Sequence, residues 1–170
     1  MSTLVSIFGK SLRERNMKLL VLFVLASFGL PLYAADIASC SNPTGKSYYP
    51  ETGLVDAKDS GWADDKISGG VTKLSKVGDN EYDILFVDVR KEIISAREDG
   101  GHVFLLNRGK NLVSVLVVYM GKTAEIYTFL KNNSGKLEYI HVLSRAGDGV
   151  LISKATIMRG DCSYINFEAL

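Results

Sequence analysis

The sequence predicts an all-β fold: a single-domain antiparallel meander, closed as a barrel or a sandwich, with an irregular N-terminal arm. Turn residues recur about every 8 to 15 residues through the second half of the chain, a spacing close to that of a meander. β-Branched and aromatic residues fill the runs between these turns. No segment after residue 35 has the apolar period of an amphipathic helix.

Residues 1–34 are predicted to be a secretory signal peptide, so we expect a periplasmic or secreted protein. The positive residue Lys18 precedes an apolar run, Leu19–Leu30, and the small residue Ala34 follows it, which is the order of a cleavable export signal. The run has twelve residues, whereas a helix that spans a bilayer needs about 20. A retained membrane anchor is the competing interpretation. Met17 directly precedes Lys18 and is an alternative start of the chain.

Residues 35–65 are predicted to form the irregular arm, and residues 66–170 the β-domain. Ser, Asn, Pro, Gly and Tyr concentrate in the arm, and residues 41–45 are Ser-Asn-Pro-Thr-Gly. These are turn residues, and neither a helical nor a strand period runs through them. We therefore expect the arm to lie on the β-domain without joining its sheet.

The predicted strands cover residues 82–89, 102–106, 112–119, 123–130 and 137–143, and a last element covers 151–165. Turns such as Asp99-Gly100-Gly101 and Asn107-Arg108-Gly109 contain residues that tolerate positive φ, as tight hairpins require. Residues 112–118 are apolar at almost every position, so both faces of this strand are expected to be covered. One face of the strand 123–130 is mixed, formed by Thr123, Glu125, Tyr127 and Phe129.

The chain has two cysteines, Cys40 and Cys162, which are predicted to form a disulfide. An even number of cysteines in an exported protein favours pairing, because oxidising compartments rarely leave thiols free. The alternative is a lipoprotein, since Ile37-Ala38-Ser39-Cys40 loosely resembles the bacterial lipobox that directs lipid attachment to Cys. The two modifications exclude each other at Cys40.

The balance of charges excludes several classes of partner. The first 34 residues hold four basic residues and one acidic residue, so the remainder holds 16 basic and 18 acidic residues, a net charge of −2. Nucleic-acid binding needs clustered Lys and Arg, and a polybasic membrane-surface protein would need the same. We therefore expect no nucleic-acid partner, and no membrane span after cleavage of the signal.

Two local patterns imitate ligand sites without matching them. Gly121-Lys122-Thr123 resembles the end of a phosphate-binding loop, but Leu116 stands where that loop needs its first glycine. Four carboxylates, Asp56, Asp59, Asp64 and Asp65, flank Trp62 and offer oxygen ligands for calcium, but their spacing does not match a calcium loop. A hairpin turn and a polar turn are the favoured interpretations, and we expect no metal and no cofactor.

The candidate binding residues are Tyr48, Tyr49, Trp62, His102 and His141. Adjacent aromatic residues in an irregular arm are suited to a recognition surface, because aromatic residues are enriched at interfaces, although packing of the arm explains them equally well. Each histidine lies in a predicted strand, where a partly buried, hydrogen-bonded role is more common than catalysis. No Gly-x-Ser-x-Gly motif is present, and no catalytic residue is assigned.

These observations predict an exported binding or interaction module, inhibitor-like in character, that acts on an envelope or secreted protein. Two alternatives stay open: a small secreted hydrolase that uses His102 or His141 with a carboxylate, and a carrier of a small apolar ligand inside a barrel. An enclosed apolar cavity would favour the carrier. A histidine within reach of both a carboxylate and a serine would favour the hydrolase. An exposed aromatic patch with neither feature would favour the interaction module.

Overall fold

The computed structural model describes residues 35–87 and 91–170, so the predicted signal peptide lies outside the described residues. The strands are β1 (Ala35–Tyr49), β2 (Gly61–Lys66), β3 (Val71–Gly78), β4 (Glu81–Val87), β5 (Ile93–Ser95), β6 (His102–Gly109), β7 (Leu112–Tyr119), β8 (Thr123–Lys131), β9 (Leu137–Arg145) and β10 (Lys154–Ile165). Two short 3-10 helices, η1 (Ala57–Asp59) and η2 (Phe167–Ala169), complete these elements. The all-β prediction is confirmed. Among the described residues no helix has the length and apolar character needed to cross a bilayer.

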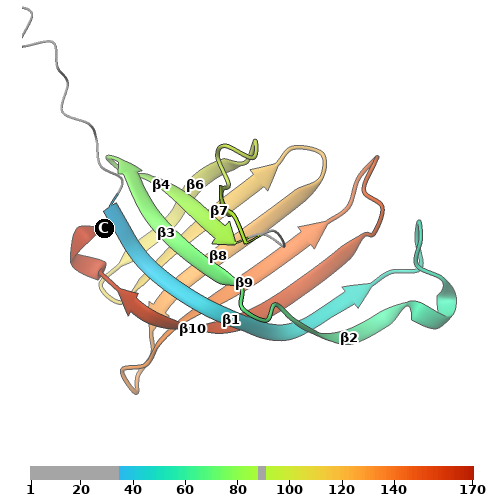
Figure 1. Ribbon diagram of the computed structural model, residues 1–170, viewed down its shortest axis with the longest axis horizontal. Coiled ribbons are helices and arrows are strands. Elements are labelled where there is room, and N and C mark those ends of the chain that lie inside the picture. The colour runs from blue at the N-terminus through green and yellow to red at the C-terminus, as the bar shows by residue number, and fades with distance from the viewer. Residues whose placement is uncertain (1–34, 88–90) are drawn as a thin grey trace, which may run out of the picture. The chain divides into compact units, whose positions relative to one another are not determined.

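One antiparallel sheet contains all ten strands (Figure 1). Its strand order is β5-β4-β3-β1-β10-β9-β8-β7-β6, and β2 pairs with β1 beside this path. The stretch from β6 to β10 is the predicted meander, because each strand pairs with the next one along the chain. The sheet curls on itself as a half-barrel, so the sandwich alternative, which needs two stacked sheets, is wrong.

The expectation of an irregular arm over residues 35–65 is correct only for residues 50–60, between β1 and β2. β1 occupies the centre of the sheet, where it pairs with β10 along most of its length, with β3 through its first half and with β2 through its second. The turn-forming residues 41–45 are accommodated by a register shift between Ser41 and Thr44, and Asn42 has a positive φ of 50°. They form a β-bulge, because an extra residue on one strand can be left unpaired without ending the strand.

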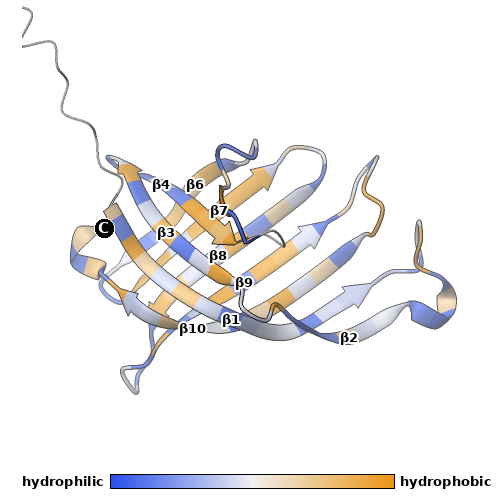
Figure 2. Ribbon diagram, viewed as in Figure 1, coloured by the Kyte–Doolittle hydropathy of each residue, from blue (hydrophilic) through white to orange (hydrophobic). Residues whose placement is uncertain are grey.

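The core lies on the concave face of the sheet. Along β7, Val113, Val115 and Val117 are buried at 0 to 1% exposure, whereas Leu116 and Val118 on the convex face are half-buried. The expectation that both faces of this strand are covered is therefore wrong, because no second layer packs on the convex side among the described residues. Figure 2 shows the resulting alternation of apolar and polar bands along the strands.

The predicted disulfide between Cys40 and Cys162 is formed. The two residues lie directly opposite each other on β1 and β10, the pair of strands that joins the two ends of the chain. Because both sulfurs are bonded to each other, Cys40 has no thiol for lipid attachment. Disulfides persist in oxidising compartments and are rare in the cytosol, so this bond favours a location outside the cytoplasm.

Candidate functional site

The half-barrel holds a cavity of about 810 Å³ on its concave side. The apolar part of its wall includes Val71, Phe86 and Leu143, and the aromatic part includes Tyr127 and Tyr139. These side chains come from β3, β4, β8 and β9, so strands from both halves of the sheet border the space, which is open to solvent on one side. Such a wall is suited to the apolar body of a small molecule.

Residue pairs between β8 and β9 define the depth of the cavity. At the open end Thr123 pairs with Arg145, and at the deep end Phe129 pairs with Tyr139. Phe129 and Tyr139 are 0% and 1% exposed, and their rings stack with centroids 5.8 Å apart. Arg145 is exposed. The cavity therefore extends from Thr123 and Arg145, beside the β7–β8 and β9–β10 connections, to Tyr139, whose ring stacks on the buried Phe129.

A buried polar cluster of Glu125, Tyr127 and His141 lies between these two ends. Glu125 and Tyr127 are two residues apart on β8 and share its concave face, and Tyr127 pairs with His141 on β9. Glu125 Oε2 accepts hydrogen bonds from the Tyr127 hydroxyl and from His141 Nε2, the latter at 3.0 Å. The Tyr127 and His141 rings stack at a centroid distance of 4.4 Å and an angle of 9°.

The cluster holds an ionised carboxylate inside the protein. Burial would raise the pKa of Glu125, but the hydrogen bonds from His141 and Tyr127 and the charge of Arg145 outweigh it and lower the pKa below its usual value. Burial and the charge of Glu125 raise the pKa of Tyr127 well above its usual value, so its hydroxyl remains a donor. An ionised carboxylate only accepts hydrogen bonds, which assigns a proton to His141 Nε2.

The depressed pKa predicts acid sensitivity at Glu125. A carboxylate whose pKa is lowered in the folded protein stabilises it above the unfolded-state pKa, near 4.5, and this contribution is lost as the pH falls through the folded-state pKa. Glu125→Gln leaves one donor of the cluster without its carboxylate partner and should cost about 1–3 kcal/mol at neutral pH. Urea unfolding should show this difference from wild type shrinking below about pH 4.5. A difference that stays constant into the acid range would contradict the assignment of an ionised Glu125.

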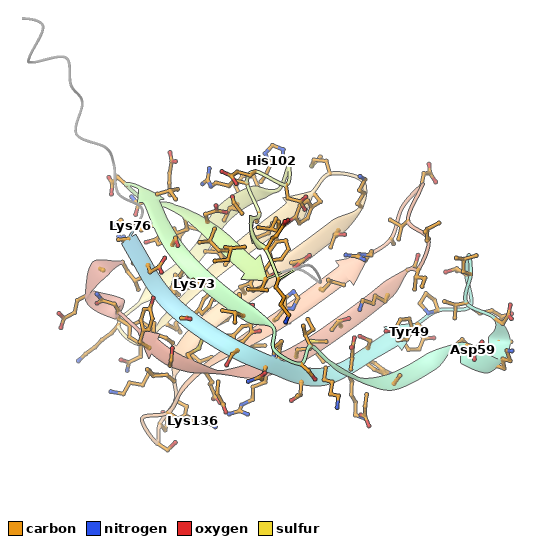
Figure 3. The ribbon with its side chains drawn as sticks, in the orientation of Figure 1. Tyr49, Asp59, Lys73, Lys76, His102 and Lys136 are labelled. Atoms are coloured by element: carbon orange, nitrogen blue, oxygen red, sulfur yellow. A yellow bond between two sulfur atoms is a disulfide. The ribbon has the colours of Figure 1, made fainter. Side chains whose placement is uncertain are left out.

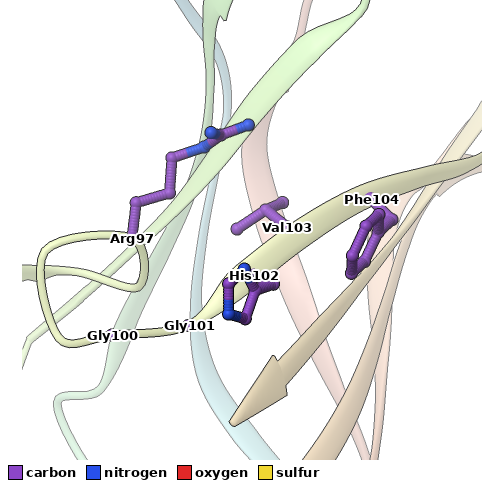
Figure 4. A pocket seen from close by; sticks show the side chains of 6 residues that line it. All are labelled: Arg97, Gly100, Gly101, His102, Val103 and Phe104. Atoms are coloured by element: carbon purple, nitrogen blue, oxygen red, sulfur yellow. The ribbon is translucent and has the colours of Figure 1, made fainter. Parts of the chain in front are cut away.

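The two histidine candidates lie on opposite faces of the sheet. His141 is in the cavity, whereas His102 pairs with Val118 on the convex face and lines a separate surface hollow of about 410 Å³ with Arg97 and Phe104 (Figure 4). Arg97 Nε donates to the Tyr82 carbonyl oxygen at 2.8 Å. Only His141 has a carboxylate partner among the described residues.

The aromatic candidates do not gather at the cavity. Tyr48 and Trp62 pair across β1 and β2, with ring centroids 5.4 Å apart, and are 41% and 66% exposed. Tyr49 lies beside Lys154, whose Nζ is 5.9 Å from the centroid of its ring. Figure 3 shows Tyr49 at the end of β1, well apart from His102. Tyr48 and Trp62 therefore form an exposed aromatic pair that is distinct from the cavity.

Two of the acidic residues flanking Trp62, Asp64 and Asp65, have cationic or hydroxyl partners. Asp64 pairs with Lys46 at 2.8 Å, and Asp65 accepts hydrogen bonds from Ser47 Oγ at 2.7 Å and from Lys154 Nζ at 3.3 Å. Within residues 35–87 and 91–170 no group of three or more His, Cys, Asp or Glu side chains is placed to hold a metal ion.

Glu125 and Tyr127 are the site residues that the sequence candidates missed. Their signal was the mixed face of the strand 123–130, where a glutamate stands in line with aromatic residues. Gly121-Lys122-Thr123 forms the hairpin turn expected of it, with a φ of 71° at Gly121, and Lys122 and Thr123 line the cavity. Comparison with known proteins finds no matching family model, no matching curated protein and no matching solved structure.

Proposed function

We propose that this protein is a binding module that holds a small molecule with an apolar body in the cavity of the half-barrel, as a carrier in the periplasm or outside the cell. The cavity itself supports the proposal. Its volume, about 810 Å³, lies within the range of roughly 300–1,000 Å³ typical of small-molecule sites. Its wall combines aliphatic and aromatic side chains with polar and charged ones, which include Glu125, His141 and Arg145; small-molecule sites likewise combine an apolar lining with placed polar groups.

The Glu125 cluster offers one polar anchor inside this wall. Glu125 Oε2 is occupied by its two donors, whereas Oε1 has no hydrogen-bond partner among the described residues. The side chains of Glu125 and His141 are 12% and 11% exposed, and the cavity is their access to solvent. A hydroxyl or amide N–H on the bound molecule could donate to Oε1, because an ionised carboxylate with a free oxygen is a strong acceptor.

The two other functions predicted from the sequence have less support. For the hydrolase, His141 has the carboxylate partner Glu125, but among the described residues no serine donates to or accepts from it. For the interaction module, the exposed Tyr48–Trp62 pair on the convex face is the supporting feature. Both functions stay predictions.

A pair of neighbouring substitutions tests the carrier. Leu143 lines the cavity and is 7% exposed, whereas Val142 lies on the convex face and is 40% exposed. The neutral fluorescent probe N-phenyl-1-naphthylamine should bind wild type saturably at one site. Leu143→Trp fills the cavity and should weaken binding at least tenfold, about 1.4 kcal/mol. Val142→Trp adds the same side chain outside and should leave binding unchanged.

Two outcomes would overturn the carrier. One is the absence of saturable probe binding to wild type, and the other is equal loss of binding in both tryptophan variants. Circular dichroism and urea unfolding of the two variants establish that each is folded under the binding conditions. Hydrolysis of a generic ester that disappears in His141→Gln, without saturable probe binding, would favour the hydrolase.

A further inference from the structure

The rim of the cavity brings two cationic side chains together. Arg145 at the end of β9 pairs with Thr123 at the start of β8, and Lys122 directly precedes Thr123. The backbone N–H of Ala146 donates to the Lys122 carbonyl oxygen at 3.0 Å, which ties the β7–β8 turn to the end of β9. Both Lys122 and Arg145 line the cavity. The two cations therefore share one side of its mouth.

Neither cation forms an ion pair with a carboxylate within the described part of the chain, although the charge of Arg145 contributes to the lowered pKa of Glu125. The other acidic groups near the cavity are engaged: Asp65 pairs with Lys154 at 3.3 Å, and Glu125 with His141 at 3.0 Å. Asp99 is the remaining carboxylate in the wall, and it is exposed. Asp148 of the β9–β10 loop is a further exposed carboxylate near this end, although it does not line the cavity. The lining residues at this end are therefore two cations without an ion pair, Lys122 and Arg145, and one such carboxylate, Asp99.

The charges change sign from the mouth inward. Arg145 of β9 pairs with Thr123 of β8 at the rim. Glu125 is two residues further along β8 than Thr123, on the same face, and it is ionised. A negatively charged group is therefore attracted by the cations at the rim and repelled by Glu125, because charges near a protein surface interact more strongly than charges in bulk water. The wall beyond Glu125, formed by Tyr127 and Tyr139, suits an apolar chain. This arrangement orients an amphiphile with its head outward.

We propose that the molecule carried in the cavity is an anionic amphiphile whose carboxylate or phosphate head is bound at the rim by Lys122 and Arg145. This inference rests on the carrier function proposed above. The Arg145 guanidinium provides paired N–H donors that match either head group, and Lys122 adds a second charge. The apolar residues of the β9–β10 loop, Leu151 and Ile152, are 72% and 43% exposed at this end and flank the head with apolar surface.

Ligands of equal chain length and different head groups test the inference. Dodecanoate, dodecyl phosphate, dodecanol and dodecylammonium each compete with bound N-phenyl-1-naphthylamine at mildly alkaline pH. We expect at least one of the two anions to bind wild type about tenfold more tightly than dodecanol, and dodecylammonium to bind most weakly. The anion that binds more tightly identifies the head group.

A second double variant that removes the same charge elsewhere separates the effect of the two rim cations from the effect of the protein's net charge. Lys122→Gln/Arg145→Gln should remove the preference for the anion, because the affinity for the anion falls much more than the affinity for dodecanol. Arg108→Gln/Lys110→Gln removes the same charge beside the β6–β7 turn, at the end of the sheet where Val113 is buried, and should keep the preference.

The failures of the two proposals are distinguishable. Equal binding of dodecanol and both anions to wild type, or equal loss of the preference in both double variants, overturns the anionic head group while the carrier stands. Failure of the probe and of all four amphiphiles to bind overturns the carrier.

Discussion

Removal of the Cys40–Cys162 disulfide is expected to lower the free energy of unfolding by about 4–5 kcal/mol, the chain-entropy value for a closed loop of more than 100 residues. The bond joins residues 122 positions apart, so its loss frees almost the entire described chain in the unfolded state. In the folded state β1 and β10 remain paired through their backbone hydrogen bonds. Since small domains are stable by about 5–15 kcal/mol, this loss is a large fraction of the total.

Urea unfolding of wild type and of Cys40→Ala/Cys162→Ala measures the effect. The double variant should unfold at a lower urea concentration, and treatment with a reductant should shift wild type but leave the variant unchanged. A double variant within about 1 kcal/mol of wild type would show that the disulfide adds little to stability, as happens when the unfolded state retains structure.

Gly45→Ala is expected to destabilise the protein by about 3 kcal/mol, at the upper end of the range for overpacking. Gly45 lies opposite Met158 where β1 crosses β10 closely. A Cβ there would overlap the Ile157 carbonyl oxygen and lie 2.7 Å from Met158 Cα. Because these are backbone atoms, the clash cannot be relieved by a change of rotamer. The two strands would have to separate at the centre of the sheet.

Gly109→Ala is the matched control. Gly109 is likewise paired across two strands, at the end of the β6–β7 pairing, but an added Cβ would meet only Leu112, at 3.8 Å from its Cγ, which is ordinary van der Waals contact. Thermal unfolding should show a large decrease in Tm for Gly45→Ala and little change for Gly109→Ala. Equal behaviour of the two variants would contradict the close approach of β1 and β10.

The strands from β6 to β9 could be predicted from the sequence because each of them is joined to the next by a short turn, and β10 follows β9 after the loop of residues 146–153. Turn chemistry such as Gly121 with positive φ, and alternation along β8, are local properties. β1 was not predicted as a strand, because residues 41–45 have turn composition and their bulge is stabilised by pairing with β10 and β3. Those partners lie far along the chain and leave no local signal.

The candidate site shows the same division. His141 was a candidate from the sequence, and Glu125 was recognised as a member of a mixed strand face, but their contact depends on the register between β8 and β9. The two residues are 16 positions apart, and a register shift of one residue would place one of them on the opposite face. Similarly, Lys122 belonged to a hairpin turn in the sequence. The register between β8 and β9 places it beside Arg145, and the curl of the sheet forms the cavity that both residues line.

The sequence by itself determined the β class, most of the turns of the meander and the pair of cysteines. Residue alternation, residues that tolerate positive φ and the number of cysteines can all be read without knowing which strands pair. The tertiary structure decided the place of β1 between β3 and β10, the curl that makes the cavity, and the meeting of Glu125, Tyr127 and His141 inside it. These features depend on which strands pair and in which register. Strand pairing depends on residues far apart in the chain, because the burial of one face of the whole sheet specifies it and no single segment does.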